Sequence, residues 1–321
     1  MMEYHLIAIF IAVLIDFIIG DPPAWPHPVK WIGSGISLLE KLLNKGISRK
    51  SKGLIMVFLI ISVVFLVSFS LVWLCYLIHP VLGIAAEAII ISTAIAQKGL
   101  KQAALEVYQP LKNGNMVDAR LKLSYIVGRD TENLNKEEVV RGTVETVAEN
   151  ISDGVTAPLF WGLIGGAPIA IVYRAINTCD SMVGYKNEKF QDFGWAAARL
   201  DDLVNWIPSR LTAIMIMSGH KPACMSRKQG FRILFRDAKR HPSPNSGWLE
   251  AAIASLLGVQ LGGVNYYKGI ISNRQTMGEP ILRLNEEHII KTNSILTRTT
   301  ILFLLFISMG GLLYELAGTW F

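Results

Sequence analysis

An uncharged apolar stretch from Leu54 to Ile78 limits what this chain can fold into more than any other feature of its sequence. Its roughly 25 residues are enough for a helix that crosses the hydrocarbon core of a bilayer, which is roughly 30 Å thick. The composition agrees, because 51% of all residues are hydrophobic and only 17% are charged. An ordinary soluble domain is less apolar than this, so the chain is predicted to be a membrane protein.

Three more segments predict membrane spans: residues 5–20, 81–96 and 301–321. Each carries one acidic residue in an otherwise apolar run, namely Asp16, Glu87 and Glu315. The first segment lacks the basic flank and the small-residue cleavage site of a signal peptide. Two other apolar segments, 157–176 and 203–217, are interrupted by Pro, Arg or Asn. They are expected to be spans, re-entrant segments or helices buried in protein.

The distribution of Lys and Arg predicts how the chain lies across the membrane. The basic segments 30–52, 98–141 and 221–240 are all placed in the cytoplasm by the positive-inside rule. Both termini are then expected outside, and residues 98–298 form a largely cytoplasm-facing catalytic region. This rule and the attraction of anionic headgroups account for the net charge of +6, so no nucleic-acid partner is expected. The prediction is an inner-membrane protein, surrounded by membrane lipids, with residues 1–321 in a single membrane-embedded domain.

Helix signals dominate the rest of the chain. Residues 98–123 have helical periodicity broken at Pro110 and Gly114, which predicts two helices around a turn. Asn135 has the features of an N-cap, and its helix is expected to run to about Ile151. No segment shows convincing strand alternation. The predicted fold class is mainly α: a multi-pass α-helical membrane protein with buried or re-entrant helices and cytoplasmic loops.

Acidic side chains follow one face of the helix that begins at Asn135. Glu145, Glu149 and Asp153 are spaced at i, i+4 and i+8, and Arg141 lies one turn earlier. Such a stripe is often a solvated face. Here apolar sequence follows Asp153 directly, so the stripe points toward the membrane boundary. Because a buried carboxylate is costly unless it is paired or bound to a cation, a cation-assisted site is predicted.

Polar residues also interrupt the apolar sequence farther along the chain. Asn177 and Asp180 end an apolar segment that has no evident need of them, which favours a functional role. Asp201 and Asp202 suit either a site or a helix cap before Leu203.

Two proline-fixed loops are candidate binding elements. Residues 241–247 (HPSPNSG) lead into a helix expected to begin near Trp248, whose first N–H groups and dipole favour an anion. A simple capping loop would explain the same residues. Residues 20–28 form a similar stiff polar turn. The chain has neither a Walker A motif nor a G-x-G-x-x-G fingerprint after a strand, so a nucleotide would bind by another scheme.

Seven sequence blocks together resemble one known family. In chain order they are GDPPAWPHPVKWIG, GRDT, VETVAENISDGVTAPLF, YRAINTCDSMVGYK, FGWAAARLDDLVNWIPSRLTA, SPNSGWLEAA and LGGVNYYKG. They are similar to the adenosylcobinamide-phosphate synthase family of cobalamin biosynthesis, and they extend from Gly20 to Gly269. Cys179 departs from the pattern, which has a larger apolar residue there, but this affects nothing catalytic. The resemblance implies an inner-membrane ligase that joins adenosylcobyric acid to aminopropanol, or to its phosphate, through an ATP-dependent amide bond.

The implied reaction assigns roles to the polar residues. ATP and Mg²⁺ are the expected cofactors, and carboxylates are suitable hard ligands for Mg²⁺. Four residues are expected to be catalytic: Glu145, Glu149, Asp180 and Arg210. Four are expected to hold the metal: Glu149, Asp153, Asp201 and Asp202. Substrate and nucleotide binding is expected of a larger set: Asp21, His27, Arg129, Asp130, Thr131, Asn150, Asn177, Lys186, Arg199, Ser243, Asn245, Ser246 and Gly247.

The expected partners are the corrinoid and an aminopropanol-type substrate. The resemblance also allows contact with other membrane enzymes of corrinoid nucleotide-loop assembly. Two other classes stay open from the residues alone. A membrane transporter or sensor would also place polar residues in broken apolar helices, although the inverted repeats typical of transporters are not found. A membrane phosphatase would use similar metal-binding carboxylates without consuming ATP.

Overall fold

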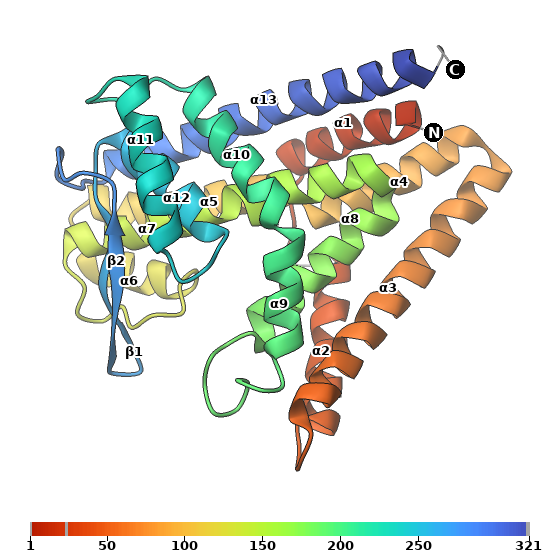
Figure 1. Ribbon diagram of the computed structural model, residues 1–321, viewed down its shortest axis with the longest axis horizontal. Helices are drawn as coiled ribbons and strands as arrows, with labels where there is room; N and C mark the ends of the chain where they lie inside the picture. The colour runs from red at the N-terminus through yellow and green to blue at the C-terminus, as the bar shows by residue number, and fades with distance from the viewer. Residues whose placement is uncertain (1, 23–24, 319–321) are drawn as a thin grey trace. The chain divides into compact units, whose positions relative to one another are not determined.

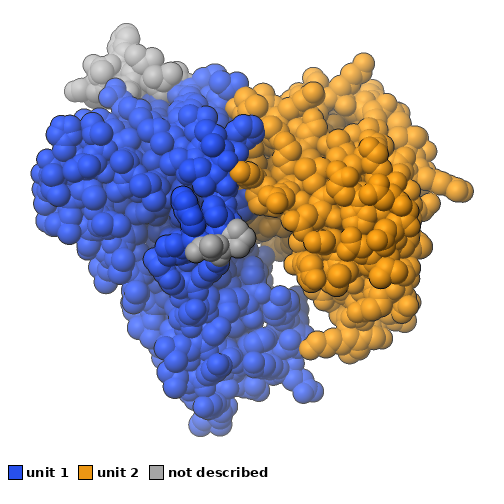
Figure 2. Space-filling model, turned by 180° about the vertical axis from the view of Figure 1, so that it is seen from behind, with its two compact units in different colours: residues 1–96, 154–205, 304–321 blue, residues 97–153, 206–303 orange. Residues whose placement is uncertain are grey.

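The computed structural model describes residues 2–22 and 25–318, and for residues 312–318 it describes the backbone alone. Contacts between residues group the chain into two compact units (Figure 2). Unit 1 comprises residues 1–96, 154–205 and 304–321, and unit 2 comprises residues 97–153 and 206–303. The sequence predicted a single domain. Each unit draws on stretches that are far apart in the chain, and no local sequence signal marks the points where the chain passes from one to the other.

Unit 1 is built from apolar helices. They are α1 (Met2–Ile18), α2 (Pro28–Leu43), α3 (Arg49–Ile78), α4 (Pro80–Ala94), α8 (Ala157–Val183), α9 (Trp195–Val204) and the end of α13 (Glu287–Gly318). The chain turns back between α3 and α4 at His79, whose ring nitrogen accepts a hydrogen bond from the Val81 N–H at 3.2 Å (Figure 1). This side-chain cap begins α4 directly after α3 ends. Apolar side chains such as Ile36, Met56 and Phe193 fill the core between α2, α3, α8 and α9.

The middle of α8 is broken at Gly165 and Gly166, where the backbone leaves helical geometry. Gly166 has a φ of +64°, and a Cβ there would lie 2.7 Å from His5 Cε1 and 2.9 Å from Glu87 Oε1. Glycine is therefore required both for the left-handed conformation and for the close approach. The carboxylate of Glu87 is buried and lies 2.8 Å from His5 Nδ1. The acidic residue that interrupts a predicted span is thus partnered inside the unit.

Among the described residues, four helical stretches are long and apolar enough to cross a membrane: Arg49–Ile78, Pro80–Lys112, Lys136–Val183 and Glu287–Gly311. The first, second and fourth overlap the predicted spans 54–78, 81–96 and 301–321, of which residues 319–321 lie outside the described residues. The predicted span 5–20 is present as α1, a helix of 17 residues at the short end of the spanning range. The third stretch includes the interrupted apolar segment 157–176. The predicted class, a multi-pass α-helical membrane protein, is confirmed.

Unit 2 surrounds a single buried helix. Its helices are α5 (Gln97–Lys112), α6 (Met116–Ser124), α7 (Lys136–Ile151), α10 (Trp206–Gly219), α11 (Arg227–Asp237), α12 (Ser246–Leu257) and most of α13. Every residue of α12 is buried, as expected of a helix that is apolar on all sides. The two helices predicted in 98–123 are present as α5 and α6. The predicted N-cap is also present, because Asn135 and Glu138 exchange hydrogen bonds of 2.8 and 3.0 Å in a capping box.

The mainly α fold class is confirmed, but the search for strand alternation in the sequence missed a β-hairpin. β1 (Leu261–Tyr267) and β2 (Ile270–Met277) form an antiparallel hairpin in unit 2. Its two-residue turn, Lys268 and Gly269, has positive φ at both positions, which is typical of a type I′ turn. Glycine and asparagine interrupt the apolar pattern of β1, so its sequence does not alternate like a half-buried strand. Contacts with the rest of unit 2 stabilise this hairpin, and such contacts cannot be predicted from a local sequence pattern.

Candidate functional site

Three glutamates of unit 2 lie close enough to influence one another electrostatically: Glu145 and Glu149 on α7, and Glu250 on α12. We call them the glutamate cluster. The α-helical repeat brings Glu145 and Glu149 to one face, as the sequence predicted. Asp153 instead lies in a π-helical turn, η1 (Ser152–Thr156), directly after α7. Because a π turn has a different repeat, Asp153 does not continue the stripe in α-helical register.

Glu145 is buried, and both of its carboxylate oxygens are engaged. Oε2 accepts a hydrogen bond from the Arg129 guanidinium at 2.8 Å, and Oε1 accepts one from the Gly262 N–H at 2.8 Å. Arg141 Nε lies 3.8 Å from the same Oε1 atom. This carboxylate therefore joins α7 to the start of β1, and its two strong partners compensate the cost of burying it.

Neighbouring charged residues also hold the hairpin. Arg141 donates to the carbonyl oxygen of Gly262 at 2.6 Å, and Arg129 donates to the side-chain oxygen of Asn265. The two oxygens of Asp130 accept from the N–H groups of Lys268 and Gly269 at 2.9 and 2.7 Å, which caps the turn of the hairpin. The structure thus gives Arg129 and Asp130 a structural role, and their predicted role in substrate binding stays a prediction.

Glu149 differs from Glu145 in having one oxygen to spare. It is partly exposed, and its Oε1 accepts a hydrogen bond from Ser246 Oγ at 2.9 Å. Ser246 Oγ in turn lies 3.2 Å from Ser243 Oγ. Within residues 2–22 and 25–311, no hydrogen-bond partner is found for Glu149 Oε2. Among the glutamate cluster, this is the carboxylate that can still bind or deprotonate another molecule.

Glu250, the third member of the cluster, lies beside His241; the sequence placed His241 only in the candidate loop 241–247 and did not single out Glu250. The Glu250 side chain is 2% exposed, and its Oε1 lies 3.4 Å from His241 Nε2. Burial, with the negative charges of Glu145 and Glu149, raises the pKa of Glu250 well above its ordinary value. Burial lowers the pKa of His241, so the imidazole is held neutral. The sequence signal that could have identified Glu250 is an acidic residue in an otherwise apolar helix. Glu87 interrupts α4 in the same way.

The 241–247 loop is a self-contained cap for α12. The helix begins at Ser246, two residues before the predicted Trp248. Ser243 Oγ accepts hydrogen bonds from the N–H groups of Asn245 and Ser246, both at 3.2 Å. The N–H group of Ser246, one of those proposed for an anion, is thus satisfied by Ser243, as the capping alternative predicts.

Gly247 is required by packing. A Cβ at this position would lie 2.4 Å from the carbonyl oxygen of Ala238 and 2.6 Å from His241 Cβ. The start of α12 therefore packs tightly on the 3₁₀ turn η2 (Ala238–Arg240). A larger residue at position 247 would displace backbone, so its effect would report packing rather than anion binding.

Arg210 lies beside the same loop. Its guanidinium stacks over the rings of Trp206 and Trp248, at 4.4 and 5.1 Å from their centroids. It also donates to the Asn245 side-chain oxygen at 3.2 Å and to the Pro244 carbonyl oxygen at 3.3 Å. Arg210 and the 241–247 loop, which the sequence predicted separately as site elements, are thus brought together by α10 and the start of α12.

Three aspartates of unit 1 form a second group, the aspartate cluster: Asp180 on α8, and Asp201 and Asp202 on α9. Asn177 Nδ2 donates to Asp201 Oδ1 at 3.2 Å. Burial and the nearby Asp180 raise the pKa of Asp201 to about 7. Burial also raises the pKa of Asp202, against the opposing charges of Arg199 and Lys186.

The position of Asp201 and Asp202 excludes one of the two interpretations of their sequence, and their role in a site stays a prediction. Both lie near the end of α9, and Asn205 follows as its C-cap. The alternative that they cap a helix beginning at Leu203 is therefore wrong. Four of the predicted site residues, Asn177, Asp180, Asp201 and Asp202, lie in one unit, with Lys186 and Arg199 close to Asp202.

The remaining predicted site residues have local partners. His27 Nε2 lies 3.0 Å from Asp21 Oδ1, and His27 Nδ1 accepts from the Val29 N–H and so caps α2. Asn150 Nδ2 donates to the Thr146 carbonyl oxygen at 2.8 Å. Thr131 is buried in the turn before α7. The predicted site residues therefore fall into two groups, one in each unit.

No group of three or more His, Cys, Asp or Glu side chains that could hold a metal ion occurs in the part of the chain that the structure describes. The four predicted ligands, Glu149, Asp153, Asp201 and Asp202, are not gathered into such a group. Mg²⁺ is commonly bound by one or two carboxylates together with water and substrate phosphates. The spare oxygen of Glu149 and the Asp180–Asp201 pair have the donor chemistry for that weaker mode of binding.

Comparisons with known proteins agree with one another. The family described as CobD/Cbib protein matches residues 9–296. The chain is 49% identical to the "Cobalamin biosynthesis protein CobD" of Halalkalibacterium halodurans, over 98% of this chain and 100% of that protein. It is 47% identical to the protein of the same name from Clostridium perfringens, over 91% of this chain and 93% of that one. The corresponding protein of Geobacter metallireducens is 46% identical, over 85% of this chain and 86% of that one. No solved structure matches the chain.

Proposed function

Because the chain belongs to the CobD/CbiB family of cobalamin biosynthesis, we propose that it catalyses the ATP-dependent ligation of adenosylcobyric acid with aminopropanol or aminopropanol phosphate. The match extends over nearly the whole chain, and the seven sequence blocks lie within or close to it. The relatives are named for the pathway, and the reaction itself is our proposal.

The reaction sets the requirements for the site. The terminal phosphoryl group of ATP passes to the corrinoid carboxylate, which gives an acyl phosphate and ADP. The amine then attacks the acyl carbon, the C–N bond forms, phosphate leaves, and the amine loses a proton. The protein has to neutralise phosphate charge in the first step and to accept a proton in the second.

Glu149 is the proposed proton acceptor, and its unpaired Oε2 atom is the observation that carries the proposal. Glu145 has both oxygens engaged by Arg129 and Gly262, and Glu250 is almost fully buried. Glu149 alone in the cluster combines partial exposure, a free oxygen and a hydroxyl partner that fixes its orientation. A carboxylate placed in this way can accept a proton from an attacking amine.

Arg210 is the proposed phosphate contact near Glu149. Its stacking on two tryptophans restricts the guanidinium, and a restricted planar cation loses less entropy when it binds a phosphate. Mg²⁺, when bound, would neutralise the phosphates of ATP. Within unit 2, Glu149 is the carboxylate proposed to contact it, and the Asp180–Asp201 pair of unit 1 is proposed as a separate cation-binding position.

Turnover by the purified full-length protein tests this function. With ATP, Mg²⁺, adenosylcobyric acid and amine present, ADP release should require both organic substrates, and mass spectrometry should detect the amide. Phosphate release without ATP would instead indicate the phosphatase alternative. Corrinoid uptake into vesicles without ADP release would indicate a transporter. Either result would overturn the ligase assignment.

The proposed location is the inner membrane, with the reaction on the cytoplasmic side, where ATP is available. Single cysteines introduced at Lys50, Gly128 and Lys228 should react with an impermeant reagent only from the cytoplasmic face. Labelling of the Gly128→Cys variant from outside would overturn this orientation, and with it the access of the site to ATP.

A further inference from the structure

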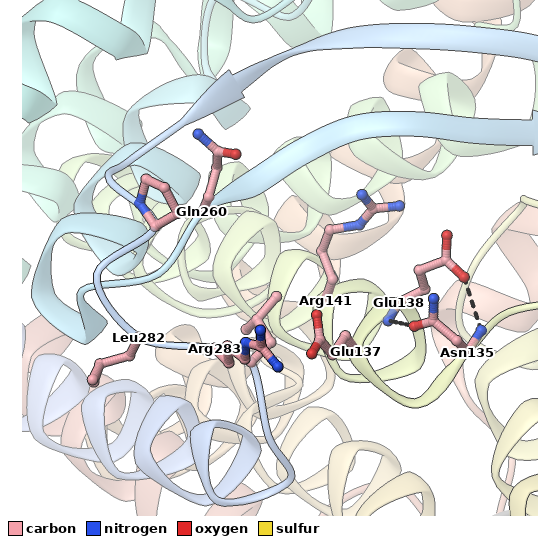
Figure 3. A pocket seen from close by; sticks show the side chains of 9 residues that line it. Asn135, Glu137, Glu138, Arg141, Gln260, Leu282 and Arg283 are labelled. Atoms are coloured by element: carbon pink, nitrogen blue, oxygen red, sulfur yellow. Dashed lines mark hydrogen bonds between the residues drawn. The ribbon is translucent and has the colours of Figure 1, made fainter.

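Unit 2 contains a cavity of about 380 Å³ that the proposed reaction does not yet use (Figure 3). It lies between the start of α7, the residue before β1 and the segment that follows β2. Asn135, Glu137 and Arg141 line it from α7, and Gln260, Leu282 and Arg283 line it from the hairpin side. All of these residues belong to the same unit.

Hydrogen bonds fix the walls of this cavity. The capping box of Asn135 and Glu138 sets the first turn of α7. Arg141 ties α7 to the Gly262 carbonyl oxygen at 2.6 Å. The Leu282 N–H donates to the Gly258 carbonyl oxygen at 2.8 Å, which holds the third wall against the end of α12. A cavity with walls held in this way is largely formed before a ligand arrives.

Three polar side chains facing the cavity are not used by the fold. Glu138 and Arg141 are occupied by the capping box and by the hairpin. No hydrogen bond or ion pair is found for Glu137, Gln260 or Arg283 within residues 2–22 and 25–311. Glu137 and Arg283 carry opposite charges and line one cavity without pairing, and Figure 3 labels both among the side chains that line it. A ligand that bridges them would satisfy both charges at once.

The lining defines the chemistry of such a ligand. Arg283 suits a phosphate or carboxylate, Glu137 suits an ammonium group, and the Gln260 amide can bond a hydroxyl between them. Pro280, Leu282 and Leu284 offer apolar contact for a short carbon chain. The volume is at the lower end of the range for small-molecule sites, which excludes a macrocycle as large as a corrinoid.

The cavity is adjacent to the glutamate cluster. Arg141 lines the cavity and also lies 3.8 Å from Glu145. Glu137 precedes Arg141 by one turn and Glu145 by two turns on the same face of α7, so it lies about 12 Å from Glu145 along the helix axis. We infer that this cavity is a binding site for a small zwitterion in which an ammonium group and a phosphate are separated by a few carbon atoms, with Glu137, Gln260 and Arg283 as its ligands.

The choice of probe rests on the proposed function, because 1-aminopropan-2-ol O-phosphate is the zwitterion among its candidate substrates. Calorimetry on the full-length protein in detergent, without ATP, should show this probe binding at least tenfold more tightly than 1-aminopropan-2-ol or inorganic phosphate, which each carry one of its two charges. Glu137→Gln and Arg283→Ala should each weaken binding of the zwitterion about tenfold or more, since each loses a charge-assisted hydrogen bond. Gln260→Ala should have a smaller effect.

Two exposed residues of the same unit provide matched controls, Glu106→Gln and Arg227→Ala, which should leave binding unchanged. Glu137 and Arg283 are exposed, so the thermal midpoint of their variants should stay close to that of the parent chain. Unchanged binding in both Glu137→Gln and Arg283→Ala would overturn the site even if the ligase reaction is confirmed. Weakened binding in these variants would support the site even if no amide forms, so the two proposals can fail separately.

Discussion

The glutamate cluster and the aspartate cluster contain the same kind of side chain in two different electrostatic settings. In the glutamate cluster, Glu145 is paired with Arg129, while Glu149 accepts a hydroxyl. In the aspartate cluster, burial and the nearby Asp180 raise the pKa of Asp201 to about 7, against the opposing effect of the hydrogen bond from Asn177. A cation beside a buried carboxylate favours its ionised form, whereas burial and a neighbouring like charge favour its protonated form.

The largest expected effect concerns the ion pair of the glutamate cluster. Glu145→Ala should lower the free energy of unfolding by about 3–5 kcal/mol, because it leaves the Arg129 guanidinium buried without its carboxylate. Glu106→Ala, which breaks an exposed pair with Lys122, is the control and should cost less than about 1 kcal/mol. Denaturant unfolding in detergent measures both. A loss below 1 kcal/mol at Glu145 would remove the distinction between a structural glutamate and a catalytic one.

Turnover should separate Glu149 from Glu145. Glu149→Gln is expected to lower kcat at least a hundredfold, the usual range for loss of a general base, while the unfolding midpoint changes little. Ser246→Ala removes only the hydroxyl that orients Glu149 and should reduce kcat less. Near-normal amide formation by Glu149→Gln would exclude it as the proton acceptor.

A smaller effect, dependent on pH, is expected in the aspartate cluster. The pKa of Asp201 is about 7 in the folded protein, above its ordinary value of 3.8, so the folded state binds more protons between these two values. The free energy of unfolding should therefore fall as pH rises from about 4 to 7, by up to about 1.4 kcal/mol per pH unit. Asp201→Asn should remove this slope in metal-free buffer, whereas Asp192→Asn, at an exposed position, should keep it. A slope that persists in Asp201→Asn would assign the titration to another group.

The smallest effect should come from the loop that supports Glu149. Ser243→Ala removes the acceptor for the N–H groups of Asn245 and Ser246, and the loss of such a hydrogen bond typically costs about 1 kcal/mol. The same variant should raise the KM for ATP only if the loop also binds phosphate. Thermal unfolding and initial rates measured on one preparation distinguish a cap from an anion site, and no change in either would exclude both roles.

Local signals predicted much of the fold but less of the site. Asn135 and Glu138 lie three residues apart, so their capping box was readable from the sequence. The spans were readable because a bilayer demands long apolar runs. The hairpin was missed because Gly262, Gly263 and Asn265 interrupt the apolar alternation expected of a strand. The side chains that hold β1 are also more than 100 residues away in the sequence: Glu145, Arg129 and Arg141.

The sequence by itself determined the family, the helical membrane class and the residue types available for chemistry, since these depend on composition, short-range periodicity and motif order. Only the tertiary structure decided which carboxylates form hydrogen bonds within the fold and which remain available to bind another molecule. Glu145 and Glu149 are one helical turn apart and read alike in the sequence. The N–H of Gly262 and the guanidinium of Arg129 occupy the first, while the second keeps a free oxygen. The physical reason is that the ionisation and availability of a carboxylate depend on groups brought near it by folding, and those groups come from distant parts of the chain.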